Sequence, residues 1–244
     1  MSRHLAAVSG RLFWVTMLVG SALITASSIA YFDFDTLPPF VVEKLPVRFE
    51  ALWLASLRLH VASAALAFPL CLSLVTRALR RRALLHRWLG RITGCLVLLA
   101  LVPSGVVLAF DAKGGRAVTL GFLVSAGIVA CSMVFGILAA RRRNFVSHHR
   151  AMRHVVAQMS VAVTSRALIF CFDALGVDPD FSYVIALWGP VLASAAVVEL
   201  ISSRHASIAR ITVPPDGGIV REASPFTVLV RLRSFARPVV RPGR

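Results

Sequence analysis

Arginine, histidine and glutamate side chains stand inside long apolar segments of this 244-residue chain. An ionisable side chain in hydrocarbon costs roughly 2.5–3.5 kcal/mol on insertion scales, so it normally faces a bundle interior and marks a functional position. Several cations that converge in a low-dielectric bundle suit the recognition of a carboxylate or phosphate. The sequence therefore predicts a pocket for a small anionic or lipidic ligand. Its candidate residues are His60, His86, Arg87, Arg91, His148, His154, Arg166, Trp188 and Glu199.

His60 and Arg166 form a first candidate pair. At 1.5 Å per residue, His60 lies about 13 Å into the second apolar segment, and Arg166 about 9 Å from the end of the fifth. If these two segments cross the membrane in opposite directions, both side chains lie in the outer leaflet and can share a polar pocket. The alternative is that Arg166 snorkels outward while His60 bonds a neighbouring carbonyl.

Histidines near the opposite ends of their segments suggest a different chemistry. Imidazoles on several helices of a bundle are what bis-histidine haem ligation requires. One b-type haem between His86 and His148 or His154 is therefore an alternative hypothesis, as is a quinone without haem. A pair of haems is not expected, because His60 has no histidine partner in its half. The cofactor is otherwise unknown.

Two further alternatives remain open. The chain could be a structural or regulatory membrane component without chemistry of its own. Whether it is an enzyme is uncertain, because Ser and His occur without a nucleophile elbow, an HExxH motif or paired acids. No thiolate metal site is predicted, since the four cysteines are scattered and none forms a CxxC pair.

Glu199 is the only acid inside any of the apolar segments. A cation within about 4–6 Å keeps a buried carboxylate ionised. We expect Arg91 to be that cation, with Arg153 as the alternative, because all three stand near the same ends of their segments. Such a pair would lock helices together, or it would serve a proton or a ligand.

The elements that must position these residues are apolar segments of about 20 residues, the length that crosses a bilayer. Hydrophobic residues make up 57% of the chain, which is more than a soluble protein can bury. The first segment exceeds the apolar core of a signal peptide and is expected to be retained. The fold class is therefore all-α, a polytopic membrane protein with a bundle of about six transmembrane helices. The expected spans are Leu12–Tyr31, Ala51–Val75, Trp88–Phe110, Ala117–Ala140, Val155–Phe172 and Phe181–Ile201.

Charge alternates between successive connections of these segments. Two connections are flanked by arginines: Arg77, Arg80, Arg81, Arg82 and Arg87, then Arg141, Arg142, Arg143, Arg150 and Arg153. The other three carry most of the acids: Asp33, Asp35, Glu43, Glu50, Asp111, Asp173, Asp178 and Asp180. Because positive loops stay in the cytoplasm, both termini are predicted to be cytoplasmic. The net charge of +16 then indicates contact with anionic lipid head groups rather than nucleic acid.

Three regions follow from this organisation. Residues 1–50 hold the first helix and an outer loop, residues 51–202 a five-helix membrane domain, and residues 203–244 a basic cytoplasmic tail. The outer loop, from Phe32 to Glu50, is expected to be extended and partly structured. The sequence does not specify an oligomeric state or a role for the tail.

Several short motifs of the membrane domain occur in one order and spacing. They are Leu59-His60, His86-Arg87-x-Leu89-Gly90-Arg91, Gly114-Gly115, His148 with Met152, Val163-Thr164-x-Arg166, and Trp188 with Glu199. Over roughly residues 50–202 the chain resembles the bacterial predicted-membrane-protein family catalogued as domain of unknown function 2306. The His-Arg-x-Leu-Gly-Arg element is the most specific part.

Two positions depart from the family pattern. Where it has a Trp before the Met and an Arg two residues after it, this chain has Ala151 and His154. A fixed positive charge is thereby replaced by a titratable imidazole. With the charge pattern, the resemblance implies a multi-pass protein of the bacterial inner membrane, and the family name carries no activity.

Overall fold

A computed structural model describes residues 2–33, 35–36 and 38–211, and every regular element within them is a helix. Six helices are long and apolar enough to cross a membrane, which confirms the expected all-α, six-span class. The cytoplasmic position of the termini stays a prediction. The spans are Gly10–Phe32, Glu50–Val75, Ala83–Ala109, Gly115–Arg141, Phe145–Ala174 and Pro179–Ser203.

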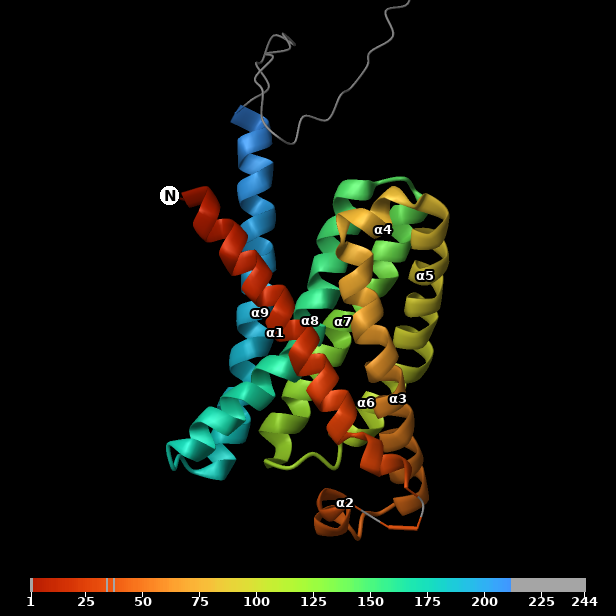
Figure 1. Ribbon diagram of the computed structural model, residues 1–244. Helices are drawn as coiled ribbons and strands as arrows, with labels where there is room; N and C mark the ends of the chain where they lie inside the picture. Colours follow the sequence, from red (N-terminus) through yellow and green to blue (C-terminus); the bar gives the residue numbers. More distant parts are fainter. Residues whose placement is uncertain (1, 34, 37, 212–244) are drawn as a thin grey trace, which may run out of the picture. The chain divides into compact units, whose positions relative to one another are not determined.

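Each span is built from one or more helices (Figure 1). The first comprises α1 (Ser2–Ser27) and the 3-10 turn η1 (Ile29–Phe32), and the second is α3 (Glu50–Val75). The third joins α5 (Ala83–Leu96), a π-helical segment η2 (Val97–Leu101) and α6 (Val102–Ala109). The last three are α7 (Gly115–Arg141), α8 (Phe145–Ala174) and α9 (Pro179–Ile211).

Two short helices mark opposite ends of the bundle (Figure 1). Helix α2 (Pro39–Lys44) lies in the connection before α3, and α4 (Arg77–Arg81) in the connection after it. We call these ends the α2 end and the α4 end. The connection from Phe32 to Glu50, expected to be extended and partly structured, thus contains a helical turn.

The main core lies among α1, α3, the third span, α7 and α8. Close approach of α7 to α8 depends on Gly136, where an added Cβ would lie 3.2 Å from the Cβ of Ala151 and 2.2 Å from the Met152 side chain. A second cluster joins α9 to α7 and α8 through Val118, Val161, Leu187 and Val191. The main core contains Met17, Ala67, Phe68, Cys71, Leu72, Val97, Leu101, Val129, Met133, Val155, Met159 and Val163.

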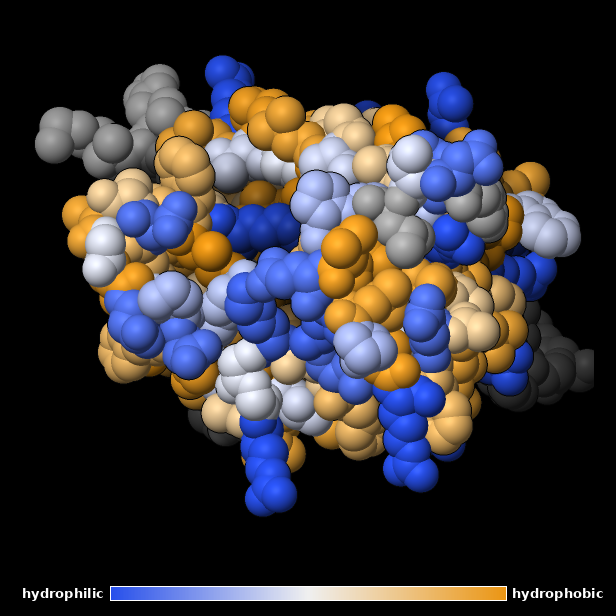
Figure 2. All heavy atoms as spheres, turned by 90° about the horizontal axis from the view of Figure 1, so that it is seen from below, coloured by the Kyte–Doolittle hydropathy of each residue, from blue (hydrophilic) through white to orange (hydrophobic). Residues whose placement is uncertain are grey.

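The α2 end is closed by apolar packing and by one exposed ion pair. Val41 of α2 is buried against Trp53 and Leu57 of α3. The Lys113 ammonium lies 2.7 Å from Glu43 and lowers the pKa of that carboxyl, while Glu43 raises the pKa of Lys113. Figure 2 looks onto this end and shows hydrophilic side chains near its middle and at several points of its rim, with apolar side chains between them.

Two spans begin well before the residue that hydropathy indicates. The third begins at Ala83 rather than Trp88, and the fifth at Phe145 rather than Val155. Asn144 caps α8, because its side-chain oxygen accepts a hydrogen bond from the Ser147 amide at 3.1 Å. The polar residues between 147 and 154 therefore belong to α8 itself.

Contacts divide the chain into two units, Met1–Ser202 and Ser203–Arg244. The first unit contains the main core, the second cluster and the apolar packing at the α2 end. The expected basic tail lies outside the described residues from position 212 onward.

Candidate functional site

Arg150, His154 and Gln158 stand at four-residue intervals on α8. They therefore lie on the same face of that helix, about one turn apart. The first two converge on Glu199 of α9. His154 Nε2 lies 2.8 Å from Glu199 Oε1, and the Arg150 guanidinium donates to Glu199 Oε2. One carboxylate is therefore shared by two cation-capable side chains.

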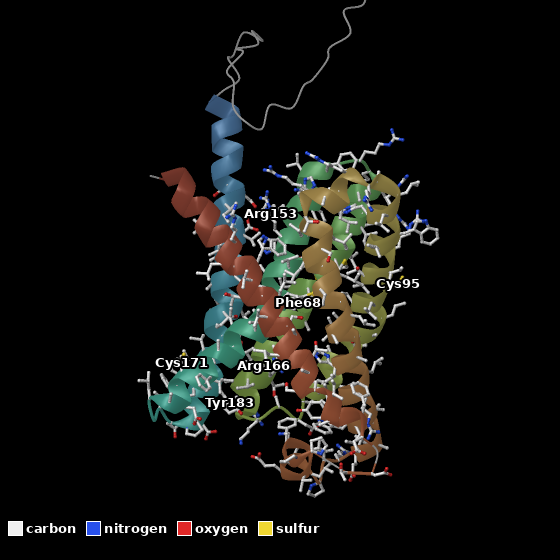
Figure 3. The ribbon with its side chains drawn as sticks, in the orientation of Figure 1. Phe68, Cys95, Arg153, Arg166, Cys171 and Tyr183 are labelled. Atoms are coloured by element: carbon white, nitrogen blue, oxygen red, sulfur yellow. The ribbon has the colours of Figure 1, made fainter. Side chains whose placement is uncertain are left out.

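The expected pairing of Glu199 with Arg91 is wrong, and so is the alternative with Arg153. The Arg91 guanidinium lies 5.3 Å from the centre of the Trp88 ring, on its own helix. Depth along the membrane allowed the contact, but α5 packs on α3 and α4, whereas α9 packs on α7 and α8. Figure 3 places Arg153 at the α4-end half of α8.

A pocket of about 410 Å³ adjoins this cluster and is bounded by three helices. Arg150 and His154 supply charge-assisted donors, and Ser132 and Ser147 supply hydroxyls. The wall also includes Phe135 of α7, a residue that is 57% exposed. The lining residues are Cys131, Ser132, Phe135, Ser147, Arg150, Ala151, His154 and Glu199.

The second ring nitrogen of His154 has no hydrogen-bond partner in the part of the chain that the structure describes. Its Nδ1 is buried and makes no hydrogen bond with any described residue. The Nε2 contact with a carboxylate assigns the proton of a neutral ring to Nε2. Nδ1 is then a buried acceptor, which a water molecule, an ion or a ligand group could satisfy.

Gln158 extends the polar face of α8 toward the middle of the membrane. Its side chain is only 3% exposed. Oε1 accepts a hydrogen bond from Ser125 of α7, and Nε2 donates to the Val191 carbonyl and the Ser194 hydroxyl of α9, each at 3.0 Å. One amide thus joins the three helices that bound the pocket.

Comparison with known proteins gives a single positive result. The family described as Predicted membrane protein (DUF2306) matches residues 57–202, which include every residue of the pocket. This chain belongs to the DUF2306 family. Comparison with the curated proteins and with the solved structures gives no match. The family and the six apolar helices together establish a multi-pass membrane protein.

In this DUF2306 protein His60 supports the backbone of the third span. His60 Nδ1 lies 3.1 Å from the Leu101 carbonyl and 3.3 Å from the Ser104 hydroxyl. These positions flank Pro103, which cannot donate a backbone hydrogen bond and follows the π segment. Gly105 leaves room for the imidazole, since an added Cβ would lie 3.0 Å from its Cε1.

The Arg166 side chain makes a hydrogen bond to the backbone of its own helix, α8. Its guanidinium donates to the Ala162 carbonyl at 2.9 Å, and Figure 3 shows the residue near the crossing of α8 with α1. No hydrogen bond joins it to His60 among the described residues. A ligand shared by His60 and Arg166 stays a prediction.

The histidines at the α4 end differ in their hydrogen bonds. His148 Nδ1 lies 2.9 Å from the Gly136 carbonyl of α7, and the His148 and His149 rings are 5.8 Å apart. His86 Nδ1 is buried without a partner among the described residues. Within the described part of the chain, no group of three His, Cys, Asp or Glu side chains could hold a metal ion. Haem binding through His86 and His148 or His154 stays untested.

Two further candidate residues, Trp188 and Arg87, donate hydrogen bonds to backbone carbonyls of helices. Trp188 Nε1 donates to the Ala117 carbonyl at 2.9 Å, which ties α9 to α7, and Arg87 Nε donates to Ala83 at 3.3 Å. Of the nine candidate residues, His154 and Glu199 line the pocket. The sequence analysis missed Arg150 and Gln158 as site residues. Their spacing with His154 is a detectable signal once α8 is known to begin at Phe145.

Proposed function

We propose that this DUF2306 protein binds a small ligand with an anionic head group in the pocket bounded by α7, α8 and α9. The observation that carries the proposal is the convergence of Arg150 and His154 on one carboxylate at the pocket wall. Donors that hold the carboxylate of Glu199 have the geometry to hold a carboxylate or phosphate of a ligand.

The apolar part of the wall favours an amphiphile. Cys131 and Phe135 are exposed on α7, where a membrane protein meets lipid. A ligand can therefore place its head group at Arg150 and leave an apolar chain among the lipids. The arginine-rich connections predict that the α4 end faces the cytoplasm. The proposed ligand then comes from the inner leaflet of a bacterial inner membrane, or from the cytoplasm.

The test is ligand binding by the detergent-purified full chain, measured by native mass spectrometry. The probes are phosphatidylglycerol, phosphatidylcholine and inorganic phosphate. We expect phosphatidylglycerol to bind more tightly than the zwitterionic lipid, and saturable binding of phosphate alone would identify a soluble anion as the source.

Arg150→Gln should weaken phosphatidylglycerol binding about tenfold or more, because a hydrogen bond to a charged group contributes about 1.5–3 kcal/mol. Arg141→Gln is the matched control, since Arg141 stands at the same end of the bundle outside the pocket. Equal losses in both variants, or no binding of any probe, would reject the proposal.

A structural role is the second candidate, and Gln158 favours it. Three hydrogen bonds of a buried amide hold α7, α8 and α9 together without any ligand. If Gln158→Leu and Arg150→Gln lower thermal stability while every probe fails to bind, the polar face of α8 serves packing alone.

A further inference from the structure

We infer that ligand binding at this pocket is coupled to the uptake of one proton, and that Glu199 is the group that takes it up. The inference rests on the proposed function and adds that a proton is taken up when the ligand binds. In the described structure Glu199 occupies the donors that an anionic head group would need. The ligand and Glu199 therefore compete for Arg150 and His154.

Competition arises because the three side chains share the pocket wall. The Arg150 and Glu199 side chains are 55% and 48% exposed, so both reach the pocket surface. A ligand anion at Arg150 would lie next to the Glu199 carboxylate in the same pocket, and the Arg150 guanidinium would then no longer neutralise Glu199 alone. Two neighbouring anions disfavour each other, which favours the neutral, protonated form of one of them.

Charge balance shows that a proton must enter the pocket when the ligand binds. Before binding, Arg150 and Glu199 together carry no net charge. When the ligand anion takes the Arg150 guanidinium, a proton from water adds to a Glu199 carboxylate oxygen and forms an O–H bond. The pocket then holds one cation, one anion and one neutral acid, so its net charge is unchanged.

Glu199 is the proton acceptor among the groups that face it. Arg150 and His154 contact it from α8, and α7 contributes the thiol of Cys131 to the same pocket. Among the described lining residues Glu199 is the only carboxylate. A proton on His154 Nδ1 would become a buried donor without an acceptor, which is costly.

The deciding experiment is calorimetric titration of the full chain in detergent with short-chain phosphatidylglycerol. Its phosphodiester stays singly charged between about pH 6 and 8, so the ligand itself does not titrate. Titrations in buffers of different ionisation enthalpy give the number of protons taken up. We expect wild type to take up close to one proton per ligand and to bind more weakly as the pH rises.

Variants separate the candidate acceptors. Glu199→Gln should bind about tenfold more tightly at the upper end of this range, because the competitor is gone, and should take up no proton. His154→Gln should bind more weakly and still take up a proton. Glu43→Gln removes an acid at the α2 end and should leave proton uptake as in wild type.

The outcomes are distinguishable. Wild type that binds phosphatidylglycerol without proton uptake overturns the coupling and leaves the proposed function standing. Wild type that does not bind overturns both. If Glu199→Gln fails to fold, the wild-type proton count and the His154→Gln titration still decide between the two acceptors.

Discussion

At the scale of the residue, Glu199 is held by two donors of different chemistry. Arg150 donates from a planar guanidinium, whereas His154 donates from one nitrogen of an imidazole. That acids and cations inside spans need partners follows from the sequence, because isolated charges in hydrocarbon are costly. Which partner they find does not follow. The choice depends on how α9 is rotated against α7 and α8, and the packing of Leu187 and Val191 sets that rotation.

The contact between Arg150 and Glu199 predicts a specific non-additivity. Arg150→Gln and Glu199→Gln should each lower stability in detergent, and the double variant should cost less than the sum. Because both side chains are about half exposed, the coupling energy should be about 0.5–1 kcal/mol. Thermal or denaturant unfolding of the four proteins measures it.

A second double-mutant cycle, on Arg91 and Glu199, serves as the control, because sequence analysis favoured that pair. Arg91→Gln combined with Glu199→Gln should be additive, since Arg91 lies over Trp88 instead. Coupling in the Arg91 cycle together with additivity in the Arg150 cycle would refute the described site.

At the scale of the element, the position at which α8 starts determines whether the residues of the pocket can be recognised from the sequence. Polar residues between 147 and 154 lower the local hydropathy, so an apolar window begins only at Val155. The cap at Asn144 begins the helix earlier, and only then do Arg150, His154 and Gln158 fall on successive turns. The six spans were predictable from apolar length, whereas the π segment was not, because it depends on Pro103 and on the bond from His60.

Two glycines of α7 provide a matched test of the packing behind the pocket. At Gly136 an added Cβ would lie 3.2 Å from the Ala151 Cβ, whereas at Gly127 no atom lies within 4 Å. Gly136→Ala should therefore destabilise the protein by about 1–3 kcal/mol through overpacking. Gly127→Ala should be neutral or slightly stabilising, because alanine favours helix. Equal thermal unfolding midpoints for the two variants in detergent would contradict the described contact between α7 and α8.

At the scale of the whole molecule, the membrane orientation rests on charge. The six helices place the arginine-flanked connections at the α4 end and the acid-rich connections at the α2 end. Reporter fusions check the prediction that the α4 end is cytoplasmic. A periplasm-dependent reporter should be active after Thr36 and inactive after Arg143. The reverse pattern would move the proposed pocket to the outer leaflet.

The pocket as a head-group site is tested most directly by photo-crosslinking. A phosphatidylglycerol analogue with a photoreactive group next to its head group is irradiated with the full chain in nanodiscs, and the labelled peptides are identified by mass spectrometry. Labels should concentrate on peptides that contain Cys131–Phe135 and Ser147–His154, and excess unlabelled phosphatidylglycerol should remove them. Labels spread evenly over the six spans, or confined to the α2 end, would contradict a binding site at Arg150, His154 and Glu199.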